Sequence, residues 1–309
     1  MINDIITKLP VITDLYKTKV VSNIKDYWLT EKYDGYRTLC VNKKLYTRNG
    51  NQIYCPDWFT QLLPDDINLD GELFAGYGNW NLCGSFRRKT PDESVWKMEN
   101  VIYIVFDIID TKTDTPYHIR YKTLLNYVMK TRHTTKLDLI GIRTTPPIRI
   151  VSYTTATSIN NIQTVFNQIV TKGGEGVVLR DPLSKYVTQS KGNIFRIKKL
   201  YMKEGIVVDY KISNSQKYKG LLSSFMVVPI ADEDDFEHNI KKGQLLKQQM
   251  FSVSSGITEH IRKTYKDTFP IGTIIQYKCN DYTSTGKPRH PAFIRKREGT
   301  VTDTNCKLD

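Results

Sequence analysis

The sequence has few cysteines, and they are not spaced as in a zinc site or a disulfide framework. The 309 residues include only five cysteines, which are widely separated and form no Cys-x-x-Cys pair. This spacing argues against the common zinc motifs and against a disulfide framework. Separate thiols are typical of a reducing compartment, so we expect an intracellular protein, cytoplasmic or nuclear.

Long hydrophobic runs are also missing. No apolar stretch approaches the roughly 20 residues that a membrane-spanning helix needs, and we expect no membrane association. The first eight residues do not resemble a secretory signal, because Asp4 and Lys8 interrupt any apolar segment. Hydrophobic residues make up 39% of the chain, which is ordinary for a globular protein, and the length favours two domains.

Acidic residues are too few to balance the basic ones. There are 32 Asp and Glu residues against 45 Lys and Arg residues, which gives a formal net charge of +13. A balance this basic favours a polyanionic partner, either nucleic acid or an anionic surface.

The most informative stretch runs from Glu31 to Arg37. Aromatic and β-branched residues on both sides predict two strands, and the intervening Gly35 permits a close bend. A lysine fixed at such a bend can act as a nucleophile when burial or nearby cations favour its neutral amine. Lys32 is the candidate nucleophile, Arg37 a candidate cation, and Asp34 a candidate for orienting the amine or a metal. An exposed, charged hairpin is the alternative for this stretch alone.

Further segments place charged and aromatic side chains on predicted strands. Residues 67–74 carry the carboxylates of Asp70 and Glu72, and the apolar run 101–109 contains Phe106. A predicted helix at 158–172 ends at two glycines, and Glu175 follows at the mouth of a strand. In residues 194–199 the alternating pattern puts Arg196 and Lys198 on one face, where their repulsion favours a bound anion such as phosphate.

The last third of the chain has a different character. Five short strands are predicted at residues 205–212, 221–228, 249–254, 273–279 and 291–297, with a helix at 257–265. This count suits an OB-type barrel, which is a frequent nucleic-acid-binding module.

These segments, in this order, resemble the covalent nucleotidyltransferases, which comprise DNA ligases, RNA ligases and mRNA capping enzymes. The nucleophile motif corresponds to Lys32-Tyr33-Asp34-Gly35. The later motifs correspond to Asp70-Gly71-Glu72, Phe106-Asp107, Glu175-Gly176-Val177 and Arg196-Ile197-Lys198. The longer context, from about residue 28 to 298, is similar to the minimal two-domain ATP-dependent DNA ligases of bacteria and large DNA viruses.

The resemblance implies an α+β fold in two domains. Residues 1–200 would form an ATP-grasp-like nucleotidyltransferase domain with antiparallel sheets, which acts as the adenylyltransferase. Residues 201–309 would form a C-terminal OB-fold β-barrel. The implied activity is sealing of nicks in duplex DNA by a monomer that uses ATP and Mg²⁺ (or Mn²⁺).

The resemblance also implies residue roles. Lys32 would carry AMP, with the catalytic Asp34 and Arg37 beside it. The nucleotide would be bound by Glu31, Arg37, Glu72, Phe106, Glu175, Arg196 and Lys198, where Phe106 stacks on adenine and Glu72 contacts the ribose. Glu72 and Glu175 would hold the metal. Arg48, Arg295 and Arg297 would contact the nucleic acid.

The sequence departs from the family pattern at two places. Arg196 stands where the fifth motif usually has lysine, and a planar guanidinium contacts phosphate differently from an ammonium. Arg297-Glu298 is followed by Gly299-Thr300 in place of the usual Asp-Lys ending. Two other readings therefore stay open: an RNA ligase or GTP-using capping enzyme, and a non-catalytic nucleic-acid-binding protein.

Overall fold

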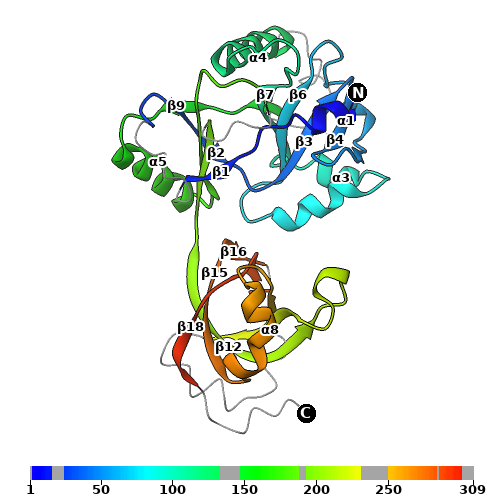
Figure 1. Ribbon diagram of the computed structural model, residues 1–309. Coiled ribbons are helices and arrows are strands. Elements are labelled where there is room, and N and C mark those ends of the chain that lie inside the picture. Colours follow the sequence, from blue (N-terminus) through cyan, green and yellow to red (C-terminus); the bar gives the residue numbers. More distant parts are fainter. Residues whose placement is uncertain are drawn as a thin grey trace. The chain divides into compact units, whose positions relative to one another are not determined.

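The computed structural model describes residues 2–15, 24–132, 147–187, 193–230, 250–283 and 285–300. The chain separates into two compact units, Met1–Lys198 and Lys199–Asp309 (Figure 1). Each unit has its own hydrophobic core, and each is described here by itself.

The first unit contains a five-stranded sheet in the order β1-β11-β10-β2-β9. Its strands are β1 (Thr13–Asp14), β2 (Trp28–Lys32), β9 (Tyr153–Thr155), β10 (Gly176–Arg180) and β11 (Ile194–Lys198). Helix α5 (Ile159–Thr171) covers one face, where apolar side chains of β2, β10 and β11 pack against Ile162 and its helical neighbours. The opposite face is left for the site.

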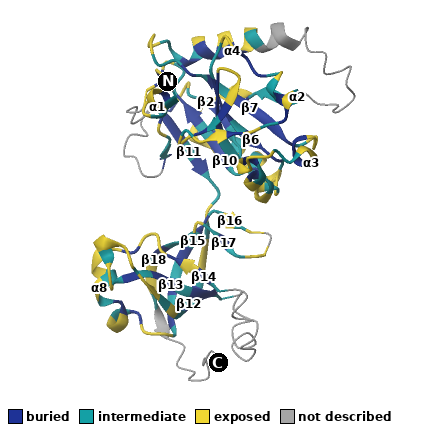
Figure 2. Ribbon diagram, turned by 90° about the vertical axis from the view of Figure 1, so that its right-hand side faces the viewer, coloured by how far each residue is buried: buried dark blue, intermediate teal, exposed yellow. Residues whose placement is uncertain are grey.

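A six-stranded sheet in the order β5-β4-β3-β6-β7-β8 forms the other half of this unit. Its strands are β3 (Tyr36–Val41), β4 (Lys44–Thr47), β5 (Gln52–Ile53), β6 (Leu69–Phe74), β7 (Ile102–Ile108) and β8 (Ile148–Ile150). One face packs on residues of α2 (Asp57–Thr60), η2 (Trp80–Arg87) and α3 (Glu93–Trp96) around the fully buried Trp96. Figure 2 shows that burial is concentrated in the strands.

Two pairs in these sheets are parallel, β1–β11 and β7–β8, although antiparallel sheets were expected. Strands β7 and β8 are joined through helix α4 (Tyr117–Arg132), and a parallel pair requires such a crossover. The first turn of this helix buries Tyr117 and Arg120. Helix α1 (Ile2–Ile6) completes the unit.

The short connection from β2 to β3 joins the two sheets, and Gly35 makes it possible. A Cβ atom at this position would lie 2.3 Å from the carbonyl oxygen of Leu73. The close approach therefore excludes any larger residue without movement of the backbone, and Lys32 is fixed at the point where the chain leaves the first sheet.

The second unit contains a five-stranded sheet in the order β14-β13-β12-β15-β18. Its elements are β12 (Tyr201–Ile212), η4 (Gln216–Tyr218), β13 (Leu222–Pro229), β14 (Phe251–Val253), α8 (Glu259–Thr268), β15 (Thr273–Cys279) and β18 (Ala292–Thr300), with a separate pair of β16 (Asp281–Tyr282) and β17 (Pro288–Arg289). The five predicted strands and the helix are therefore confirmed, with ends shifted by a few residues.

The described strands of this unit do not close into a complete barrel. A single bridge between Ser255 and Ala292 connects the segment after β14 to β18, which are at opposite edges of the sheet. The sheet thus curls around a core that includes Phe225, Tyr277 and Phe293. This arrangement is OB-like and agrees with the expected fold class. The expected helix start at residue 257 corresponds to Thr258, whose side chain caps α8 by accepting a hydrogen bond from the Ile261 amide.

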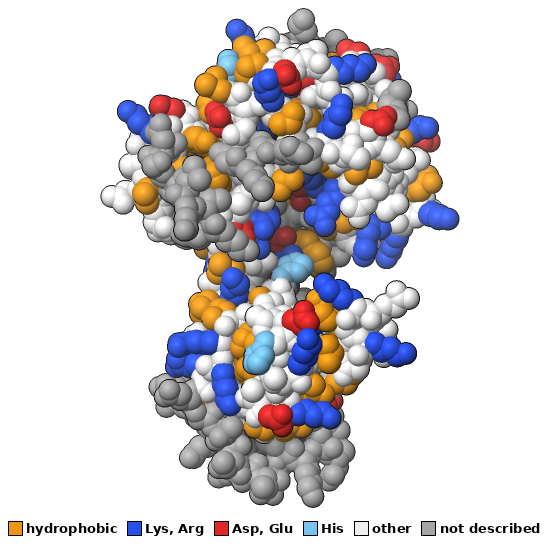
Figure 3. Space-filling model, viewed as in Figure 1, with side chains coloured by type: hydrophobic (Ala, Val, Ile, Leu, Met, Phe, Trp, Pro, Cys, Tyr) orange, Lys and Arg blue, Asp and Glu red, His pale blue; other side chains and the backbone are white. Residues whose placement is uncertain are grey.

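None of the helices in the described part of the chain is long and apolar enough to cross a membrane. Lys and Arg side chains are spread over both units on the face shown in Figure 3, with Asp and Glu side chains dispersed among them.

Gly176 provides a test of how tightly β10 and β11 pack. A Cβ atom there would lie 2.1 Å from the carbonyl oxygen of Ile197. We expect Gly176→Ala to lower the free energy of unfolding by about 1–3 kcal/mol, as overpacking does. Urea denaturation measures this. The control is Gly84→Ala, because nothing lies within 4 Å of a Cβ at that position; an equal effect of the two changes would contradict the packing argument.

Candidate active site

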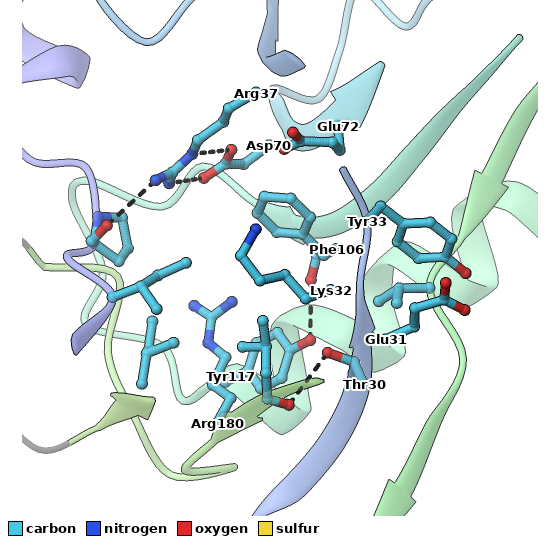
Figure 4. A pocket seen from close by; sticks show the side chains of 15 residues that line it. Thr30, Glu31, Lys32, Tyr33, Arg37, Asp70, Glu72, Phe106, Tyr117 and Arg180 are labelled. Carbon is cyan, nitrogen blue, oxygen red and sulfur yellow. Dashed lines mark hydrogen bonds and ion pairs between the residues drawn. The ribbon is translucent and has the colours of Figure 1, made fainter. Parts of the chain in front are cut away.

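A pocket lies between the two sheets of the first unit. It is lined from one sheet by Thr30, Lys32, Val178, Arg180 and Ile194, and from the other by Arg37, Asp70, Glu72 and Phe106. Figure 4 shows Lys32 extending across the middle of this pocket, beside the ring of Phe106. The candidate nucleophile Lys32 therefore lies in a pocket.

Lys32 is the last residue of β2 and forms an ion pair. Its Nζ lies 2.5 Å from Oε2 of Glu175, and both side chains are largely buried, with 20% and 17% of their surface exposed. Two residues far apart in the sequence meet here because β2 pairs with β10, with Lys32 opposite Gly176. The ion pair holds the ammonium group at the pocket.

Two further cations share this face of the sheet. The register places Lys198 beside Gly176 and Arg196 beside Val178, so Lys32 and Lys198 belong to one row across three strands. Burial lowers the pKa of Lys198, and the positive charges of Arg196 and Lys32 lower it further. A group whose charged form is disfavoured in this way is stabilised by an anion.

Arg196 already has a partner within the protein. Its Nε donates a hydrogen bond to Asp14 of β1 at 2.5 Å. The interpretation that an external anion is needed to separate Arg196 from Lys198 was therefore incomplete, because Asp14 supplies one negative charge. No local pattern predicts this pair, since the two residues are 182 positions apart.

Arg37 is held by Asp70 in a two-pronged ion pair. Nε and Nη2 of Arg37 donate to the two carboxylate oxygens of Asp70 at 3.1 and 2.7 Å, and Tyr186 donates to the same carboxylate at 2.8 Å. Burial alone would lower the pKa of Arg37, but the Asp70 carboxylate outweighs it and the pKa is raised. Asp70 therefore offsets the charge of Arg37, whose predicted role as a cation near Lys32 stays a prediction.

Glu72 lies on β6, two residues after Asp70. It is paired with Arg37 of the neighbouring strand β3. Burial raises the pKa of its carboxyl to about 8. Lys32 and Arg37 act in the opposite direction, whereas the negative charges of Glu175 and Asp70 raise the pKa further. A cation bound between Glu72 and Glu175 would reverse this balance.

Phe106 forms one wall of the pocket and is fixed from behind. The hydroxyl group of Tyr117 donates to the Phe106 carbonyl oxygen at 3.0 Å, and the Arg37 guanidinium carbon lies 5.8 Å from the ring centre. Phe106 is only partly buried, so its ring surface is available to a flat ligand. Phe106 also packs against the buried cluster that includes Phe74, Ile104 and Tyr117.

Behind Phe106 lies a buried ionic cluster that the sequence analysis missed. Asp107 accepts two hydrogen bonds from Arg120, at 2.8 and 2.9 Å, and a further ion pair from Arg180. The Arg180 guanidinium also lies 3.8 Å from the ring centre of Tyr117. Alternation along β10 places Arg180 on the same face as Val178, and this periodicity could have identified it.

Glu31 is one of the residues that line the pocket, but its carboxylate points away from the centre. Side chains alternate along a strand, so Glu31 and Lys32 lie on opposite faces of β2. Its carboxylate accepts a hydrogen bond from Tyr77 at 2.8 Å, and Figure 4 shows it beside Tyr33, away from Phe106. Thr30, which shares the face of Lys32, was missed although the same alternation predicts it.

Several predicted site residues lie outside the pocket lining. Asp34 is not among the described residues that line it, and Arg48 is an exposed turn residue. In the second unit, Arg295 donates to Gln276 at 2.9 Å and Arg297 forms an ion pair with Glu204 at 2.5 Å. Their expected contacts with nucleic acid stay predictions.

The described residues contain no group of three or more His, Cys, Asp or Glu side chains arranged to hold a metal ion. Glu72 lines the pocket, and Glu175, which does not line it, reaches it through its ion pair with Lys32. The two carboxylates are close enough to influence each other's charge. Mg²⁺ is commonly bound by one or two carboxylates together with substrate phosphates. The donors present therefore fit a magnesium ion that arrives with a nucleotide.

Comparison with known families identifies the two units. Residues 10–198 match the family described as "ATP dependent DNA ligase domain". The chain belongs to the ATP-dependent DNA ligases. Residues 215–297 of the ligase match "DNA ligase OB-like domain", so the enzyme class and the fold that the sequence motifs implied are confirmed.

Individual relatives agree with this assignment. The ligase is 24% identical to a DNA ligase of Haemophilus influenzae, over 89% of this chain and 88% of that one. A solved structure from an analysis of Lig E DNA ligases has a TM-score of 0.74 at 24% identity and covers 94% of this chain and 99% of its own. A structure of Pmar-Lig has a TM-score of 0.70 at 18% identity, with 94% and 68% covered. These structures share the fold of the ligase.

The raised pKa of Glu72 predicts a pH-dependent stability. Between the ordinary value of 4.5 and about 8, the folded protein keeps a proton that the unfolded chain releases. The free energy of unfolding therefore decreases as the pH rises through this range. We expect Glu72→Gln, which carries no titrating proton, to gain stability relative to wild type from pH 5 to pH 8. Urea denaturation at both pH values tests this; a difference between the two proteins that does not change with pH would contradict it.

Proposed function

We propose that this ligase seals 3′-hydroxyl/5′-phosphate nicks in duplex DNA through an AMP group carried on Lys32. The observation that supports this best is the position of Lys32, at the end of a strand within a pocket that is also lined by the partly buried Phe106. An amine nucleophile beside a flat aromatic surface suits attack on the phosphate of a bound nucleotide.

The adenine ring would stack on Phe106, with Val178 and Thr30 on the opposite sheet completing the base site. All three line the pocket. Glu31 would contribute to this site through its backbone, since its carboxylate lies on the other face of β2. Glu72 would contact the ribose, whose hydroxyl groups can hydrogen-bond a carboxylate.

The phosphates would lie near the row formed by Lys32 and Lys198. Lys198 is the described cation whose pKa is lowered by the neighbouring positive charges, so a phosphate would relieve its repulsion. Arg196 and Arg37 would supply further positive charge at longer range, because Asp14 and Asp70 already bind their guanidinium groups.

In the first step the Lys32 ammonium group loses a proton, and its amine attacks the α-phosphorus of ATP. A P–N bond forms and the bond to pyrophosphate breaks. AMP then moves to the 5′-phosphate of the nick, which frees Lys32 and makes that phosphate a good electrophile. Attack by the 3′-hydroxyl group joins the strand and releases AMP. Glu175 holds Lys32 at the pocket before attack. Asp34 does not line the pocket, and its catalytic role stays a prediction.

Magnesium, or manganese, would be held by Glu72 and Glu175 together with the nucleotide phosphates. When bound, it would neutralise phosphate charge that otherwise repels a nucleophile. Its arrival would also offset the mutual repulsion of these carboxylates.

The net charge of +13 favours binding to the DNA backbone. Arg48, Arg295 and Arg297 are proposed as phosphate contacts, because all three guanidinium groups are at least partly exposed. Contacts of this kind read the shape of a duplex and its phosphates, so we propose sequence-tolerant, salt-sensitive binding by a monomer.

Labelling with α-labelled ATP and magnesium, followed by a denaturing gel, tests the nucleophile. We expect label on wild type and none on Lys32→Ala, because no other amine occupies its position. Lys44→Ala, which changes an exposed lysine of β4, should label like wild type. Label on Lys32→Ala would refute the assignment. Label from GTP would favour a capping enzyme, and sealing of nicked RNA but not nicked DNA would favour an RNA ligase.

Phe106→Ala tests the stacking surface. We expect the ATP concentration for half-maximal labelling to rise by roughly 5- to 100-fold, since base stacking on an aromatic ring contributes about 1–3 kcal/mol. Phe106→Tyr keeps the ring and should stay close to wild type. An unchanged ATP requirement in Phe106→Ala would show that the base binds elsewhere.

A further inference from the structure

A polar cluster lies on the side of β2 opposite to Lys32. At its centre is the carboxylate of Glu31, which accepts the Tyr77 hydroxyl group at 2.8 Å and also interacts with the hydroxyl group of Tyr33. Burial raises the pKa of Glu31, while the two tyrosines and the positive charge of Lys172 counteract this rise. The carboxylate is therefore enclosed and supported by several donors.

This cluster also contacts the segment that carries Glu175. A Cβ atom at Gly174 would lie 3.0 Å from Oε1 of Glu31, and one at Gly173 would lie 3.4 Å from Cβ of Tyr77. The two glycines thus let the chain pass close to Glu31 and Tyr77 just before Glu175. Both members of the Lys32–Glu175 ion pair are thus next to this cluster in the chain: Glu31 precedes Lys32, and Gly174 precedes Glu175.

Tyr77 lies in the turn after a strand of the other sheet of the unit. It follows β6, the strand that carries Asp70 and Glu72, and its ring contacts Phe74 at a centroid distance of 5.4 Å. Phe74 in turn contacts Tyr33 at 5.1 Å. The hydrogen bond from Tyr77 to Glu31 therefore connects the sheet that carries Glu72 to the ends of β2 and β10, which carry the ion pair.

We propose that the Tyr77–Glu31 hydrogen bond positions Lys32 and Glu175 for the first step of the reaction. Tyr77 and Glu31 are positioning residues here, because their hydrogen bond lies on the face of β2 opposite to the Lys32 amine. Glu31 is the strand residue next to Lys32, and the Tyr77 hydroxyl group, from the segment after β6, holds the Glu31 carboxylate in place. This inference depends on the proposed role of Lys32 as the carrier of AMP.

A direct contact between the Glu31 carboxylate and the adenine base is the competing role. The two roles make different predictions. Loss of a base contact weakens ATP binding, whereas loss of positioning slows attack at saturating ATP and leaves binding unchanged. Tyr77 is 44% exposed, so its hydroxyl group can be removed without leaving a large cavity.

The experiment measures the single-turnover rate of lysine labelling for Tyr77→Phe, Glu31→Ala and the double variant, across ATP concentrations. We expect each single variant to be about 3- to 10-fold slower at saturating ATP, consistent with one hydrogen bond of about 1 kcal/mol. The ATP concentration at half-maximal rate should not change. Because both changes break one bond, the double variant should be no slower than Glu31→Ala.

Controls separate positioning from general stability. Tyr54→Phe removes the hydroxyl group of another exposed tyrosine of this unit and should label at the wild-type rate. Glu31→Gln keeps an acceptor for Tyr77 and should recover most of the rate. Thermal denaturation of every variant shows whether a slower rate follows from unfolding at the assay temperature.

Three results would overturn the inference. These are an unchanged rate in Tyr77→Phe, additive losses in the double variant, or a raised ATP requirement in Glu31→Ala without loss of the saturated rate. Failure of the proposed function looks different, because wild type would then carry no label or Lys32→Ala would keep it.

Discussion

The pairing of β2 with β10 is the constraint on which the site depends. It brings Lys32 opposite Gly176, so that Glu175, 143 residues further along the chain, lies within ion-pair distance. The same register continues into β11 and adds Lys198 to the row. A shift by one residue would turn Lys32 to the side packed by α5. The close approach at Gly176 and the ladder of backbone hydrogen bonds together exclude that shift.

The second requirement is that most charged groups around the pocket have an oppositely charged partner within the protein, whereas a few do not. Asp70 binds Arg37, Asp14 binds Arg196, and Asp107 is shared by Arg120 and Arg180. Loss of either arginine bound to Asp107, or of the Arg37 that binds Asp70, would leave a buried carboxylate without that partner. Glu72 and Lys198 lack such a closely matched partner among the described contacts, and both have pKa values shifted toward the neutral form. They are the groups whose energy would change most when a metal ion and a phosphate arrive.

Local features of the site could be predicted from sequence because they depend on neighbours in the chain. The bend after Lys32, the need for glycine at position 35 and the shared face of Arg196 and Lys198 all follow from strand periodicity and backbone sterics. The cap of α5 is another example, since the Ser158 side chain accepts a hydrogen bond from the Asn161 amide as its position predicts.

Contacts that depend on tertiary folding were not predictable in this way. The partner of Arg196, the anchoring of Arg37 by Asp70 and the ionic cluster around Asp107 join distant segments, and no local pattern marks them. Glu31 is an intermediate case. It lines the pocket, as its proximity to Lys32 suggested, but alternation along β2 turns its carboxylate toward Tyr77.

The central claim is that Lys32 carries the nucleotide in the pocket between the two sheets. The most direct measurement is tandem mass spectrometry of peptides from the ligase after incubation with ATP and magnesium, since it assigns the modified residue. We predict that the added mass of AMP is found on the peptide containing Lys32 and on that lysine alone. An AMP group on Lys198 or on any other residue would contradict the account.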